Sequence, residues 1–99
     1  MEMIEVKSGK NGRGTYTGLV GTFATIVECC LRKKVLPGFH KEGLIADATL
    51  KDKTLTLTLS GKQTGARLTE MMEIALLNIG AYPDNGSGAD FIIDVQSEQ

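Results

Sequence analysis

The chain has few cysteines and histidines, which carry much of the covalent and metal chemistry of proteins, and few prolines or tryptophans. Its 99 residues include no tryptophan, one histidine, two prolines and two cysteines. The cysteines, Cys29 and Cys30, are adjacent, and neighbouring side chains of a helix cannot form a disulfide without distorting the backbone. A disulfide framework within the chain is therefore excluded. Adjacent cysteines also lack the spacer residues of a soft-metal site, so we expect no metal and no cofactor.

Signals for export and membrane insertion are also missing. The opening residues MEMIEVKSGK carry early acidic side chains and no apolar core, so we expect no signal peptide. The longest apolar-leaning run, residues 18–30, is too short and too rich in threonine and glycine to span a bilayer. We therefore expect a cytoplasmic protein that does not enter a membrane.

Charge and aromatic content argue against nucleic acid as a partner. The formal net charge is −1, whereas a protein that binds by neutralising phosphates carries an excess of cations. Aromatic residues make up 5% of the chain, and recognition of single-stranded RNA by a sheet depends on exposed aromatic side chains. We therefore expect no nucleic-acid partner.

The residues that are present fit one small folded domain. Hydrophobic residues account for 41% of the sequence and charged residues for 23%, which is ordinary for a globular protein. A chain of 99 residues can bury one core without metals or disulfides. We expect a single α+β domain over residues 1–95 and a frayed tail over residues 96–99.

Hydrophobic periodicity predicts two helices. Apolar side chains fall on one helical stripe over residues 17–34, with cations in its last turn. A second stripe covers residues 64–79 and ends at Gly80, which suits a left-handed helix terminator. Cys30 lies within the first stripe and Cys29 beside it, so we expect Cys30 in the core and Cys29 near solvent.

Alternation predicts four strands. Residues 2–7 and 91–95 read as single strands. In residues 54–59 leucine alternates with threonine, and residues 44–50 supply a matching apolar face across a short polar connection. These two segments should therefore form a β-hairpin.

The order β-α-β-β-α-β predicts a fold class. With right-handed crossovers it gives a ferredoxin-like sandwich, in which two helices cover one face of a four-stranded antiparallel sheet. Phe23, Ile26, Leu57 and Leu76 should then share one core.

The glycine-rich stretch before the first helix is the strongest candidate site. We expect residues 8–15 to form a loop in which cationic side chains flank glycine backbone. Backbone N–H groups, a helix start and two cations at one place favour an anion. The ligand-binding candidates are Lys10, Asn11, Gly12, Arg13, Gly14 and Thr15. The alternative is a flexible turn, because the stretch matches neither the P-loop nor the dinucleotide-binding fingerprint.

A contact surface is the second candidate. Ile74 and Leu77 fall away from the apolar stripe of the second helix, on the same side as Glu70. Two apolar side chains one turn apart on an acidic face indicate an interface formed by Glu70, Ile74 and Leu77. The threonine-rich open face of the sheet is another surface that could bind a second copy or a protein partner.

These features predict a small binding or regulatory module that is homo-oligomeric and accepts an anionic small molecule at the glycine-rich loop. Two alternatives stay open. The protein could be an interaction module, such as an inhibitor or adaptor, that acts through the second helix or the open sheet face. It could also be a small hydrolase that uses Arg13 or His40, although no serine or cysteine nucleophile is placed beside His40 by the sequence.

Overall fold

The protein is described here from a computed structural model that covers residues 1–9, 12–40 and 43–98. In chain order, its elements are β1 (Glu2–Ser8), β2 (Gly12–Gly18), α1 (Thr22–Leu31), β3 (Ile45–Lys51), β4 (Thr54–Leu59), α2 (Gly65–Asn78), β5 (Tyr82–Pro83) and β6 (Phe91–Ser97). Within these described residues, neither helix is long and apolar enough to cross a membrane.

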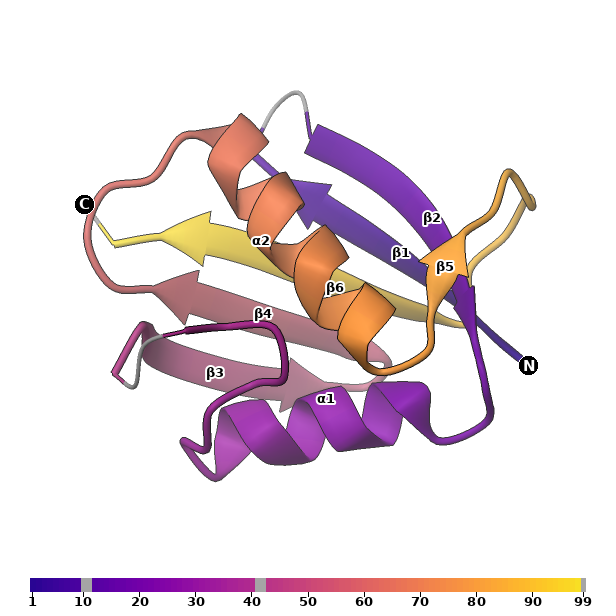
Figure 1. The fold of residues 1–99 in the computed structure, drawn as a ribbon, viewed down its shortest axis with the longest axis horizontal. Coiled ribbons are helices and arrows are strands. Elements are labelled where there is room, and N and C mark those ends of the chain that lie inside the picture. Colours follow the sequence, from indigo (N-terminus) through magenta and orange to yellow (C-terminus); the bar gives the residue numbers. More distant parts are fainter. Residues whose placement is uncertain (10–11, 41–42, 99) are drawn as a thin grey trace.

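The strands form one mixed sheet with the order β3-β4-β6-β1-β2-β5. Strand β6 lies between β1 and β4 and runs parallel to both, whereas the other pairs are antiparallel (Figure 1). The prediction of a four-stranded, antiparallel, ferredoxin-like sheet is therefore wrong. Strands β2 and β5 were not expected, and the connections through α1 and α2 each bring the chain back parallel to the strand it left.

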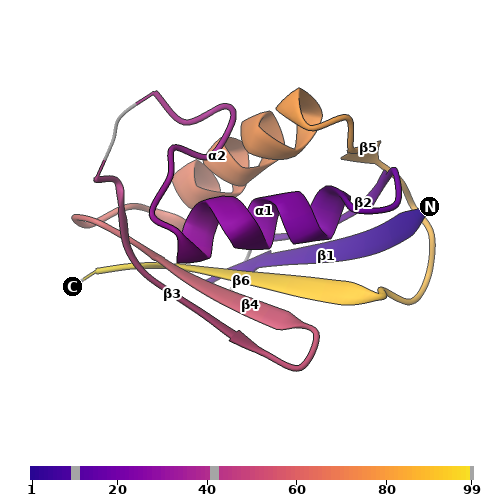
Figure 2. The ribbon, with the colours of Figure 1, turned by 90° about the horizontal axis from the view of Figure 1, so that it is seen from below.

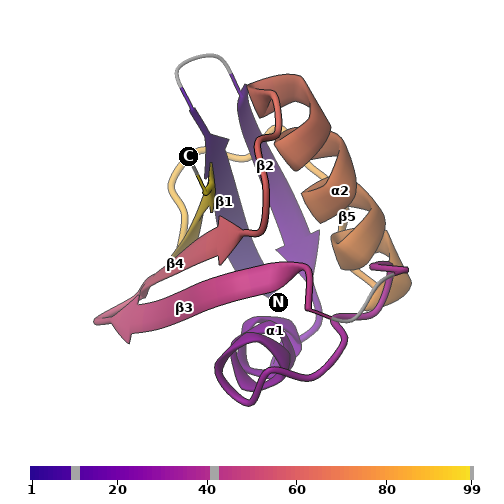
Figure 3. The same cartoon turned by 90° about the vertical axis from the view of Figure 1, so that its left-hand side faces the viewer.

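Both helices lie on one face of the sheet, and the opposite face carries neither of them (Figure 2). Helix α2 contacts β1, β2 and β6, and helix α1 contacts mainly β3 (Figure 3). The uncovered face presents mostly polar side chains in register across the five long strands. One row across that face consists of Lys51, Thr54, Ile92, Glu5 and Thr15.

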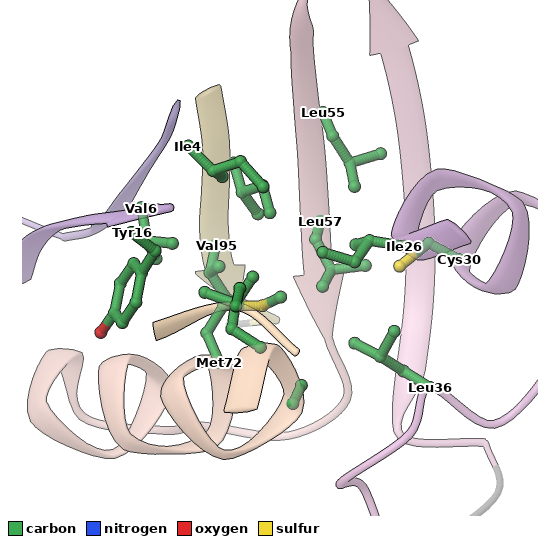
Figure 4. Close-up of a cluster of buried hydrophobic side chains, with 14 of the residues drawn as sticks. Ile4, Val6, Tyr16, Ile26, Cys30, Leu36, Leu55, Leu57, Met72 and Val95 are labelled. Carbon is green, nitrogen blue, oxygen red and sulfur yellow. The ribbon is translucent and has the colours of Figure 1, made fainter. Parts of the chain in front are cut away.

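A single hydrophobic core fills the space between the sheet and the helices. Side chains from β1, β4 and β6 meet side chains from α1 and α2 there (Figure 4). The prediction that Phe23, Ile26, Leu57 and Leu76 share this core is confirmed. Cys30 is also buried in it and Cys29 is half-buried, as their positions around the helix predicted.

The segment before α1 differs most from the prediction. Residues 12–18 form a strand that pairs with β1, so residues 12–15 of the expected loop and residues 17–18 of the expected helix belong to a β-hairpin. Helix α1 begins only at Thr22, after Gly21 takes a φ of 97°, and it ends at Leu31 rather than at residue 34. Leu19 and Val20, which extended the apolar stripe in the sequence, lie exposed between β2 and α1.

The second half of the chain follows the sequence more closely. The hairpin of β3 and β4 and the helix α2 lie where the patterns predicted them. The hydroxyl of Thr64 caps α2 by accepting a hydrogen bond of 3.2 Å from the backbone N–H of Arg67. Strand β6 continues to Ser97, where it still pairs with β4, so residues 96 and 97 belong to the sheet and not to a frayed tail.

Candidate functional site

The predicted ligand residues that the structure describes lie along the second strand of the β1–β2 hairpin. Lys10 and Asn11 lie outside the described residues, whereas Gly12, Arg13, Gly14 and Thr15 belong to β2. The Nε of Arg13 is 2.5 Å from Oε1 of Glu5 on the neighbouring strand. Helix α1 begins beyond the other end of β2, so its N–H groups do not face these residues. The loop geometry on which the anion site was argued is therefore absent, and ligand binding at these residues stays a prediction.

The glycines of β2 have a packing role in this hairpin. A Cβ atom on Gly14 would lie 3.2 Å from the ring of Tyr16, and one on Gly18 would lie 2.9 Å from the hydroxyl oxygen of Thr22. Tyr16 is buried, and this burial, with a smaller contribution from Glu73, raises the pKa of its phenol. The glycines thus leave room for neighbouring side chains over β2.

The predicted interface residues on α2 differ in exposure and in their neighbours. Leu77 is 50% exposed, and the carboxylate of Glu70 is 3.1 Å from Nη1 of Arg67 on the helix surface. Ile74 is half-buried and faces a pocket beside the helix. An interface formed by Glu70, Ile74 and Leu77 therefore stays a prediction.

This pocket lies between α2 and the connection that leads from α1 to β3. Its volume is about 370 Å³, near the lower end of the range of roughly 300–1,000 Å³ that is usual for small-molecule sites. The described residues that line it are Gly38, Phe39, His40, Leu44, Gln63, Arg67, Met71 and Ile74.

A close backbone contact forms one wall of the pocket. Gly38 has a φ of 96°, and a Cβ atom built on it would lie 2.7 Å from the Cα of Ala75. Only glycine allows the connection to approach α2 this closely. The approach places Phe39 in the core and leaves His40 exposed at the rim of the pocket.

The apolar residues of the lining are buried or half-buried whereas His40 and Arg67 are exposed, so the pocket has an apolar floor and a polar rim. Phe39, Leu44, Met71 and Ile74 supply apolar side chains, while His40, Gln63 and Arg67 supply nitrogen-bearing side chains. Arg67 can offer two parallel N–H groups to a carboxylate or phosphate. These two kinds of surface suit a small molecule with one anionic group and one apolar end.

The same lining offers little for covalent catalysis. Among the described lining residues there is no serine, threonine or cysteine that could act as a nucleophile beside His40. Cys30 lies in the core, where burial and the neighbouring Cys29 raise the pKa of its thiol to about 12. In the part of the chain that the structure describes, no group of three or more His, Cys, Asp or Glu residues could hold a metal ion.

Comparison of the chain with protein-family models, with curated proteins and with solved structures gave no match.

Proposed function

We propose that the protein is a binding module for a small amphipathic monoanion, which occupies the pocket between α2 and the α1–β3 connection. The observation that supports this proposal most is the position of Arg67 and His40 at the rim of one pocket whose floor is apolar. The two residues come from distant parts of the chain, and the fold brings them to the same cavity. In this arrangement the anionic group lies at the rim and the apolar end lies over Met71 and Ile74.

Arg67 is the main contact for the anion in this proposal. Its position is held at the backbone by the Thr64 cap and at the side chain by Glu70, 3.1 Å away. The guanidinium still has further N–H groups beyond the one that Glu70 accepts. A hydrogen bond to a charged group contributes about 1.5–3 kcal/mol, which corresponds to roughly a tenfold to a hundredfold change in affinity.

The proposal is tested with a series of straight-chain carboxylates as probes. Acetate, butanoate and octanoate are titrated into the full chain by isothermal calorimetry, with octan-1-ol as the uncharged control. We expect octanoate to bind most tightly, because each buried CH₂ group contributes up to about 0.8 kcal/mol. Octan-1-ol should bind more weakly than octanoate because it lacks the charge that Arg67 contacts.

Two matched variants locate the anion. Arg67→Gln should weaken octanoate binding by about tenfold or more. Arg32→Gln should leave it unchanged, because Arg32 does not line the pocket; it is a matched control, since it is also an exposed arginine paired with a nearby glutamate. Equal effects of the two variants, or no binding of octanoate by the wild type, would contradict the proposal. Loss of binding in Arg13→Gln alone would instead place the ligand at the β1–β2 hairpin.

A further inference from the structure

Helix α1 has an apolar side that the rest of the described chain leaves uncovered. A groove of about 540 Å³ runs between this side and β3. Leu31 on α1 and Leu50 on β3 line it and are 44% and 43% exposed. The rings of Phe23 and Phe91 stack at its base, with 4.3 Å between their centroids. Exposed apolar surface gathered in one groove is characteristic of a contact site.

Within α1, the apolar residues of this side recur at helical spacing. Ala24, Val27 and Leu31 all line the groove, at spacings of three and four residues. This spacing is that of a helix side that packs against another helix. Val20 and Val35 are exposed as well, but Gly21 and Lys33, whose φ values are positive, separate them from the helix.

The two ends of the groove carry opposite charge. Glu2 lies at the start of α1, where its Oε1 accepts a hydrogen bond of 2.9 Å from the backbone N–H of Phe23. Asp52 lines the groove from the β3–β4 turn, which lies at the same end of the molecule (Figure 1). Its neighbours Lys51 and Lys53 do not line the groove.

Cations occupy the opposite end of α1. Arg32, Lys33 and Lys34 follow its last residue and are all exposed. Arg32 and Glu28 both line the groove, and Nη1 of Arg32 is 3.6 Å from Oε1 of Glu28. Lys33 and Lys34 lie outside the groove and add two positive charges beside this ion pair. The groove therefore runs from an acidic end, through an apolar middle, to the basic end of α1.

We propose that this face joins two copies of the chain around a two-fold axis, with the two α1 helices antiparallel. A two-fold axis through the middle of α1 places the acidic end of each copy against the basic end of the other. It also sets the small Ala24 opposite the larger Leu31 of the second copy, with Val27 at the centre. Antiparallel helices bring the positive end of each helix dipole beside the negative end of its neighbour. This dimer is independent of the ligand pocket, which lies beside α2.

The test is sedimentation velocity of the full chain from low to high micromolar concentration. We expect a reversible monomer–dimer equilibrium in the wild type. Leu31→Lys should raise the dissociation constant at least tenfold, because it places a charge in the apolar middle. Leu77→Lys is the matched control, since Leu77 is equally exposed on α2, and it should leave the dissociation constant unchanged.

A charge exchange tests the antiparallel arrangement. Arg32→Glu and Asp52→Lys should each weaken self-association when studied alone, because each variant brings like charges together. An equimolar mixture of the two variants should dimerise better than either variant alone, because both charge contacts are then attractive. Circular dichroism of each variant checks that it is folded. A monomeric wild type at all concentrations, equal effects of Leu31→Lys and Leu77→Lys, or no gain in the mixture would overturn the proposal.

Discussion

The two helices of this small protein are held in different ways. Helix α2 has a side-chain cap at Thr64, and Gly65 approaches the carbonyl oxygen of Ser8 so closely that a Cβ atom would lie 3.0 Å from it. The chain also crosses α2 at Gly38. Helix α1 is shorter, has no cap from its own N-cap residue Gly21, and keeps an apolar side exposed; the Glu2 side chain on β1 accepts a hydrogen bond from its Phe23 N–H instead.

Under the two proposals, this difference gives the two helices different tasks. The contacts that fix α2 also form the proposed ligand pocket, because Gly38 and Arg67 line it. The exposed side of α1 is what the proposed dimer would cover. In this account, the helix with more contacts to its own chain supports a site, and the helix with an uncovered apolar side binds a second copy.

The largest loss of stability is expected from a substitution at Gly38, where the chain crosses α2. Gly38 and Gly21 both have left-handed φ values, 96° and 97°, but only a Cβ on Gly38 would meet other atoms. Gly38→Ala should therefore lower the free energy of unfolding by more than about 2 kcal/mol, from backbone strain and overlap with Ala75 together. Gly21→Ala, with strain alone, should cost about 1–2 kcal/mol. Urea denaturation measures the free energy of unfolding of both variants. Equal losses would show that Gly38 does not lie in close contact with Ala75.

Alkaline pH should lower the free energy of unfolding through Cys30, which lies on α1. Cys30 has a folded-state pKa of about 12 because of burial, against an ordinary value of 9.0. As the pH rises, the unfolded state therefore loses this proton before the folded state does. The contribution of Cys30 to the free energy of unfolding is fully present below about pH 9. Between about pH 9 and 12 it falls by up to about 1.4 kcal/mol per pH unit. The free energy of unfolding of the wild type and of Cys30→Val, measured from pH 8 upward, should diverge in this window. Parallel curves would mean that Cys30 is not buried as a thiol.

Removal of the side-chain cap of α2 should cause a smaller loss of stability. Thr64→Ala removes the acceptor for the N–H of Arg67 and should cost about 1 kcal/mol. Thr25→Ala on α1 is the matched control, because Thr25 is exposed and bonds only to the carbonyl of Gly21 on its own helix. Its effect should stay within about 0.5 kcal/mol. Thermal unfolding distinguishes the two, and a larger loss in Thr25→Ala would reverse the comparison of the helices.

The sequence predicted α2 well and the region before α1 poorly, for physical reasons. Thr64, the apolar spacing behind it and Gly80 are direct signals of a helix. Strand β2 gives no comparable signal, because the inward positions beside Tyr16 are the glycines Gly14 and Gly18. Glycine carries no hydrophobic pattern, so a buried strand resembles a loop in the sequence.

The proposed ligand pocket also depends on contacts that no local pattern reveals. Arg67, Met71 and Ile74 share one side of α2, and their spacing of four and three was a signal available in the sequence. What the spacing could not show is that Gly38 crosses α2 and brings Phe39 and His40 to the same side. The sheet order, with β6 between β1 and β4, likewise follows from long-range pairing rather than from any single segment.

The most direct test of the separation between the two helices is an NMR titration of the full chain with octanoate, followed through backbone amide shifts. At constant protein concentration, octanoate should shift the amides of His40, Gln63, Arg67 and Ile74 and leave those of Val27, Leu31 and Leu50 in place. Shifts confined to Arg13 and Gly14, shifts centred on α1, or no shifts at all would contradict the assignment of the ligand to the side of α2.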